Sequence, residues 1–154
     1  LNANGSVNGV IISSFDANTD GAISAGEAQA AYASQPWTCV RDEQTGLIWE
    51  VKTAANASDQ LNYSQAQSYE QAAALATCGS TKPWRLPSHE ELQSIVNYQT
   101  GGAEPAYFPY ASGARYWSNT VLYKATNRHR VINFATGDGY YNYNSSANAV
   151  ILVK

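Results

Sequence analysis

The sequence has little charge, little sulfur and no long apolar run, and each shortage excludes a class of protein. Charged residues make up only 14% of the 154 residues, whereas about a quarter is usual. No cluster of lysine and arginine gives the electrostatic footprint of a nucleic-acid-binding protein. No stretch approaches the roughly 18 consecutive apolar residues of a membrane-spanning helix. Methionine is absent, and we expect a processed or trimmed chain from which a targeting segment has been removed.

What the sequence does contain is a large share of apolar and uncharged polar side chains. Apolar residues make up 44% of the chain, which is enough to build the core of one domain. Asparagine, serine, threonine, glutamine and tyrosine supply the polarity, a profile typical of secreted and cell-surface proteins. We therefore expect an extracellular protein in which Cys39 and Cys78 form a disulfide. Two buried thiols are the alternative.

The twelve residues from Asp16 to Glu27 have the spacing of an EF-hand calcium loop. Calcium binds about six to eight oxygen atoms around a tightly curled backbone. A solvated acidic turn is the alternative interpretation. Because a single loop is present and sensor EF-hands usually work in pairs, we expect a structural Ca²⁺ rather than a switch. The predicted metal ligands are Asp16, Asn18, Asp20, the backbone carbonyl of Ala22, Ser24 and Glu27.

A break at Gln35-Pro36 divides the chain into an EF-hand-like segment, residues 1–35, and a domain of residues 36–154. The glycine and capping signals predict two central helices in this domain, flanked by strands rich in β-branched and aromatic residues. The expected class is α+β with antiparallel sheets. The predicted helices are residues 64–78, opened by Ser64 with Gln67, and 88–98, opened by Ser88 with Glu91; the predicted strands are 37–42, 47–52, 130–134, 140–143 and 149–153.

Short motifs follow one another in a fixed order through residues 37–154. They are Cys39–Asp42, Thr45–Trp49, Tyr63–Ala66, Cys78-Gly79, Trp84–Leu92, Phe108-Pro109, Tyr116–Ser118, Phe134–Gly137 and Val150–Lys154. Together they resemble the Lcl C-terminal domain family. The resemblance implies a C-type lectin-like fold, with both termini side by side in one sheet and a loop-rich upper half. It also implies a kinship with bacterial surface adhesins.

The stretch from Asp138 to Asn148 crowds tyrosines and asparagines between two strands. Tyrosine offers rigid contact area and asparagine offers adaptable hydrogen bonds, the chemistry of many binding loops. A tyrosine-rich hairpin without a ligand is the alternative. The nearby cations Arg115, Lys124, Arg128 and Arg130 are interpreted as a solvated strand face, with binding of a polyanionic ligand as the alternative. The predicted ligand-binding residues are Tyr140, Tyr141, Asn142, Tyr143, Asn144 and Asn148, with Asn119, Tyr123, Asn127 and Arg128 as neighbours.

Other conspicuous residues are assigned to structure. We expect Trp49, Trp84 and Trp117 in the core. Arg85 is expected to pair with a nearby carboxylate or with carbonyls rather than with a ligand. His89 and His129 lack a nucleophile at a recognisable spacing, and both cysteines are committed to one bridge, so we expect no enzymatic activity.

Together these features predict a secreted or cell-surface adhesion module that binds a glycan or protein ligand through its Tyr/Asn-rich C-terminal face. The alternative is a structural subunit of a surface filament or homo-oligomer, assembled through residues 1–35.

Overall fold

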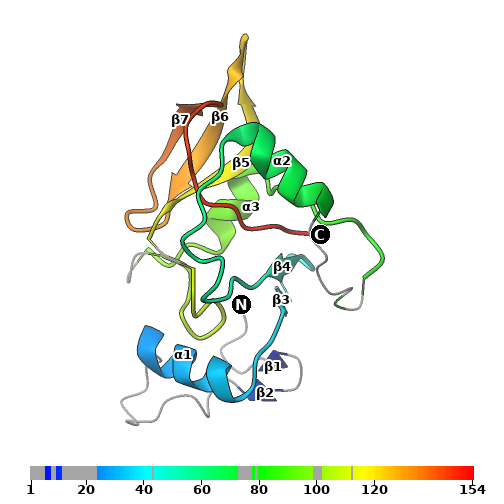
Figure 1. Cartoon of the computed structure of the whole chain (residues 1–154), viewed down its shortest axis with the longest axis vertical. Coiled ribbons are helices and arrows are strands. Elements are labelled where there is room, and N and C mark those ends of the chain that lie inside the picture. Colours follow the sequence, from blue (N-terminus) through cyan, green and yellow to red (C-terminus); the bar gives the residue numbers. More distant parts are fainter. Residues whose placement is uncertain are drawn as a thin grey trace.

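The described part of the chain combines short helices with antiparallel sheets, which confirms the expected α+β class (Figure 1). The structure is a computed structural model, and it describes residues 6–7, 10–11, 24–42, 44–72, 78, 80–98, 102–111 and 113–154. No helix in these ranges has the length and hydropathy needed to cross a bilayer. The elements are β1 (Ser6–Val7), β2 (Val10–Ile11), α1 (Ala25–Ser34), β3 (Cys39–Arg41), β4 (Ile48–Glu50), α2 (Tyr63–Ala72), α3 (His89–Ser94), β5 (Arg115–Leu122), β6 (Ala125–Asn133) and β7 (Gly139–Tyr143).

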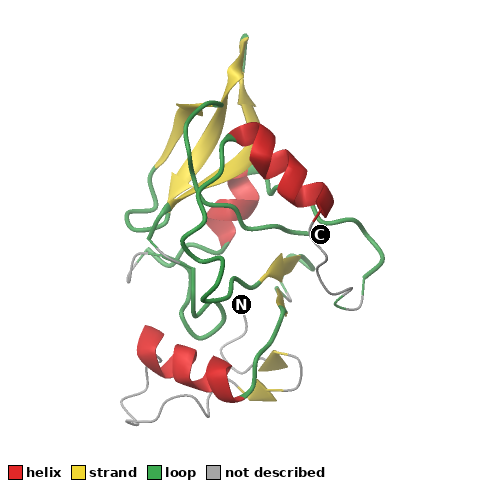
Figure 2. Cartoon of the chain, viewed as in Figure 1, coloured by secondary structure: helices red, strands yellow, loops and turns green. Residues whose placement is uncertain are grey.

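The sheet of β5, β6 and β7 is an antiparallel meander in that order. Alternate residues of a strand point to opposite faces, so neighbouring Val131 and Ile132 enter different clusters. Val131 belongs to the cluster that contains Tyr63 of α2, whereas Ile132 belongs to the cluster that contains Leu92 of α3. The two helices therefore cover opposite faces of the sheet. Figure 2 shows both helices beside the sheet and α1 at the other end of the molecule.

Reciprocal side-chain bonds fix the start of each described helix. Ser24 with Glu27 and Ser88 with Glu91 form capping boxes at α1 and α3. The predicted start of α2 at Ser64 is wrong, because Asn62 and Gln65 exchange the capping bonds and the helix begins at Tyr63. Asparagine is as good an N-cap as serine, and a glutamine three residues later completes the box.

The helix predicted at 88–98 is shorter than expected, because α3 ends at Ser94. Val96 pairs with Ala103 in an isolated bridge, and the Asn97 amide donates to the Gly102 carbonyl at 2.6 Å. β-branched residues also disfavour helix at this point. Leu92, Ile95 and Val96 are nevertheless all buried.

The last residues of the chain, 149–154, are buried and join three parts of the fold. Ala149 pairs with the start of β5, whereas Val153 bridges both Trp49 and Arg85. The predicted strand at 149–153 is thus a chain of isolated bridges rather than a regular strand. Inside it, the Leu152 amide donates to the side chain of Glu50 at 2.9 Å.

Covalent and packing contacts hold the domain together as the sequence predicts. Cys39 and Cys78 form the expected disulfide, which links β3 to the turn beyond α2. Trp49 and Trp117 are fully buried and Trp84 is 9% exposed.

The described part of the 1–35 segment packs against the domain. In α1, Ala28 is fully buried and Tyr32 meets Trp37 and Tyr110 edge to face. The Gln29 side chain donates to the Pro109 carbonyl at 2.9 Å. Residues of α1 itself therefore make the contacts that anchor this helix to the domain.

Candidate ligand-binding face

Strand alternation divides the predicted tyrosines and asparagines between the two faces of the β5–β6–β7 sheet. Tyr143 lies opposite Arg128 and Tyr141 lies opposite Arg130, so these four share one face. Tyr140 lies opposite Val131, on the face covered by α2. We call Arg128, Arg130, Tyr141 and Tyr143 the outer row. The inner face carries Tyr140, Asn142, Asn144 and Asn148.

Each arginine of the outer row lies over a tyrosine ring. The Arg128 guanidinium is 4.0 Å from the centroid of Tyr143 and also donates to its hydroxyl. The Arg130 guanidinium is 5.4 Å from the centroid of Tyr141. Tyr143 is 49% exposed and Tyr141 37% exposed. The outer row therefore offers two adjacent cation–π pairs to the solvent.

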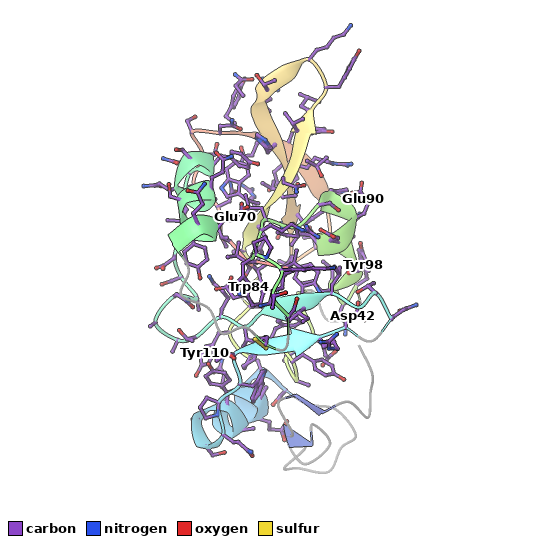
Figure 3. The ribbon with its side chains drawn as sticks, turned by 90° about the vertical axis from the view of Figure 1, so that its right-hand side faces the viewer. Asp42, Glu70, Trp84, Glu90, Tyr98 and Tyr110 are labelled. Atoms are coloured by element: carbon purple, nitrogen blue, oxygen red, sulfur yellow. A yellow bond between two sulfur atoms is a disulfide. The ribbon has the colours of Figure 1, made fainter. Side chains whose placement is uncertain are left out.

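The β5–β6 hairpin projects beyond the body of the molecule and carries exposed apolar area (Figures 1 and 3). At its turn, Tyr123 is 82% exposed and the Lys124 ammonium lies 5.2 Å from its ring centroid. Val121 is 43% exposed, and Asn127 is exposed as well. Asn119 is exposed too, but its side chain donates to the Leu86 carbonyl, which ties it to the scaffold.

The asparagines of the inner face bond to the protein itself. Asn142 donates to the Asn148 side-chain oxygen at 3.2 Å and accepts from Ser146. Asn144 donates to the Thr126 carbonyl and accepts from His129 at 2.8 Å. Asn148 is 1% exposed. These side chains shape the loop after β7, whereas the exposed part of the predicted ligand set lies on the outer row and the hairpin.

Both histidines are enclosed in packing contacts. His129 stacks on Tyr63 with ring centroids 3.5 Å apart, and burial lowers its pKa against the opposing effect of the Asn144 hydrogen bond. His89 is 4% exposed, and burial, then the Arg130 charge, lowers its pKa. Figure 3 shows Glu90, the next residue of α3, on the same side of the molecule as Tyr98.

Each of the four cations along the β5–β6 hairpin lies over a tyrosine ring. The pairs are Arg115–Tyr140, Lys124–Tyr123, Arg128–Tyr143 and Arg130–Tyr141. The interpretation as a plain solvated strand face missed these pairs, and it left Arg130 out of the candidate site. The alternation of side chains along a strand, combined with the register between β6 and β7, would have predicted the Arg128–Tyr143 and Arg130–Tyr141 pairs. Residues 111–154 hold five of the nine lysines and arginines but one of the twelve acids. Of these five cations, Arg128 and Arg130 lie on the outer row and Lys124 at the hairpin turn.

The predicted calcium ligands Asp16, Asn18, Asp20 and Ala22 lie outside the described residues. Ser24 and Glu27 are described, and they cap α1. The Glu27 carboxylate accepts from the backbone and hydroxyl of Ser24 at 2.9 and 2.7 Å. Within the described ranges no group of three potential ligands among His, Cys, Asp and Glu is gathered.

Residue 85 is positioned as the sequence predicts. Arg85 forms two 2.7 Å hydrogen bonds with Glu91, and these hold the pKa of the Glu91 carboxyl below its usual range.

Comparison with known proteins agrees with the order of the sequence motifs. The family model of the Lcl C-terminal domain matches residues 38–154. No curated protein matches the chain.

Proposed function

Since the chain belongs to the Lcl C-terminal domain family, we propose that it is a secreted or cell-surface adhesion module that binds a glycan or protein ligand. In this proposal the ligand meets the outer row and the projecting β5–β6 hairpin, and the role is binding without catalysis. The observation that most directly supports this proposal is the pair of exposed Arg–Tyr contacts, Arg128–Tyr143 and Arg130–Tyr141. Tyrosine and arginine are the residues that most often dominate binding energy.

The charge of this face favours a ligand that carries negative charge. The outer row carries Arg128 and Arg130 and the hairpin turn carries Lys124, although the whole chain has a formal charge of −3. The rings of Tyr141 and Tyr143 add flat apolar area beside the guanidinium groups. An acidic glycan or an acidic protein segment fits this combination, because the arginines supply charge and hydrogen bonds while the tyrosines supply stacking area.

We also propose that the domain has a C-type lectin-like fold. The support comes from the C-terminal segment, in which Lys154 exchanges backbone hydrogen bonds with Ile48 of β4. Since β4 pairs with β3 near the start of the family match, the two ends of the domain lie side by side. Such an arrangement leaves the opposite, loop-rich part free for ligands.

The third element of the proposal is a structural Ca²⁺ in the loop Asp16–Glu27. Its exit helix α1 begins at Ala25, directly after the ninth loop position, Ser24. Glu27 stands on the first turn of that helix and would close the site with its carboxylate. Because α1 packs on Trp37 through Tyr32, an ion in this loop would brace the start of the domain.

Ligand binding is tested with a glycan array and with pull-downs from extracellular extracts, using the full chain. Tyr141→Ala and Tyr143→Ala should each weaken binding by roughly tenfold or more, the usual effect of truncating a central aromatic. Tyr98→Ala is the matched control, because Tyr98 is 63% exposed but lies outside the outer row. Equal binding by wild type and both outer-row variants would refute this face as the site.

A structural subunit of a filament or homo-oligomer is the second candidate. In this role the 1–35 segment would mediate assembly, and strand β7, which lies at the edge of its sheet, would offer a second place for another strand to pair. Light scattering with and without chelator separates the two roles. A chelator-sensitive assembly would favour the subunit, whereas a monomer that retains ligand binding would favour the adhesion module.

A further inference from the structure

A pocket of about 360 Å³ opens on the inner face of the sheet, away from the outer row. Arg115 and Asn133 are directly opposite each other on β5 and β6. They share the face of Trp117 and Val131, since residues two apart on a strand point the same way. The volume is at the small end of the range for ligand sites. The lining residues are Gln60, Gly113, Ala114, Arg115, Asn133, Ala147 and Asn148.

The polar groups of this pocket are biased toward hydrogen-bond donors. The Asn133 oxygen accepts from the Ala135 amide at 3.0 Å, which leaves its NH₂ group for another partner. The Asn148 oxygen accepts from Asn142, and within the described residues the Asn148 Nδ2 has no partner. Asn148 is 1% exposed, and an unpaired buried amide is costly unless a ligand or water satisfies it.

A single cation completes the pocket. The Arg115 guanidinium lies 5.1 Å from the centroid of Tyr140, a contact that holds it at the rim. In the described part of the chain Arg115 forms no ion pair, and no aspartate or glutamate lines the pocket. A guanidinium group can donate two parallel hydrogen bonds, and the neighbouring amides can donate more. Such a set of donors fits a planar anion of charge −1 with two acceptor oxygens.

We propose that this pocket binds a carboxylate on a molecule of monosaccharide size, an acidic sugar such as a hexuronate. The Arg115 guanidinium receives the carboxylate. The amides of Asn133 and Asn148 donate to it or to an adjacent hydroxyl, and Gln60 bonds to the remaining hydroxyls. Gly113, which has no side chain, and the methyl groups of Ala114 and Ala147 leave room for the ring. This site is independent of the proposed function, which rests on the opposite face of the sheet.

The test is a titration of the full chain with glucuronate, followed by amide NMR shifts, with glucose as the neutral control. Glucuronate should shift the amides of Arg115, Asn133 and Asn148 in a saturable way, whereas glucose should not. Equal shifts with glucose, or no shifts with glucuronate, would overturn the assignment. Sodium sulfate at matched ionic strength is a third arm, and displacement of glucuronate by sulfate at equal concentration would overturn the choice of a carboxylate.

Two variants probe the donors separately. Arg115→Gln removes the charge at an exposed position, and Asn133→Asp keeps the acceptor for the Ala135 amide while it replaces the donor with a negative charge. Each should weaken glucuronate binding at least tenfold without changing the melting temperature. Arg128→Gln, on the opposite face, should bind as wild type does. Unchanged glucuronate affinity in Arg115→Gln or Asn133→Asp would refute the site while leaving the proposed role of the outer row intact.

Discussion

The buried carboxylate of Glu50 makes the sharpest prediction about stability. Glu50 is fully buried, and it accepts from the Lys52 ammonium at 3.2 Å and from the Leu152 amide at 2.9 Å. The Tyr69 hydroxyl also donates to it. Burial, followed by the charge of Glu50, raises the pKa of Tyr69, so the phenol stays protonated and remains a donor. This network joins β4 and α2 to the buried C-terminal segment.

We expect Glu50→Gln to destabilise the protein by about 3–5 kcal/mol, because it leaves the ammonium of Lys52 buried without a counter-charge. Lys52 is only 4% exposed, so water offers little compensation. A loss of that size is a large share of the ~5–15 kcal/mol that stabilises an ordinary domain. Urea unfolding followed by tryptophan fluorescence measures it directly.

A double-mutant cycle separates charge from packing. Glu50→Gln combined with Lys52→Met removes both charges and should recover at least half of the loss caused by Glu50→Gln alone. Tyr69→Phe is the neutral reference, with an expected cost of about 1 kcal/mol for one hydrogen bond. If Glu50→Gln costs less than about 1 kcal/mol, or if the two charge substitutions add without coupling, the assigned role of the buried pair is wrong.

The other predictions concern calcium, the disulfide and acid. A chelator should lower the melting temperature through the Asp16–Glu27 loop, by mass action on the folded state; an unchanged transition with no calcium by elemental analysis would contradict the loop. Replacing Cys39 and Cys78 together by alanine should cost about 3–4 kcal/mol in urea unfolding, because a loop of that length is freed; equal midpoints would contradict it. Because Arg85 lowers the folded-state pKa of Glu91, that carboxylate contributes stability above its unfolded pKa of about 4.3, and the contribution is lost as pH falls through the lower folded-state value. Glu91→Gln should therefore be less stable than wild type at neutral pH and lose less stability in acid, which pH-dependent unfolding would check.

Patterns that depend on neighbouring residues were read correctly from the sequence. The cap at Ser88 with Glu91 follows from local hydrogen bonding, and it is present. The burial of Trp49 and Trp117 follows from size and apolarity alone. Cys39 and Cys78 were the only pair available, so their partnership needed no knowledge of the fold.

Features that depend on partners far along the chain were not readable. The segment 149–154 has the composition of a regular strand, but its partners are spread over β4, Arg85 and β5, so it forms isolated bridges. The division of the tyrosines between two faces follows from the pairing of Arg128 with Tyr143, a register that composition does not reveal. The start of α2 was missed because two capping patterns, Asn62 with Gln65 and Ser64 with Gln67, overlap within residues 62–67.

The two-sided character of strand β7 has a consequence for how this protein changes over generations. A replacement at Tyr141 or Tyr143 alters what the solvent meets, yet it leaves the neighbouring Tyr140 and Asn142 on the packed side untouched. Selection can thus change the exposed positions of the strand while its packed positions keep the body of the domain intact. A library randomised at those two positions and at Arg128 and Arg130 would be a direct source of new specificities on an unchanged framework.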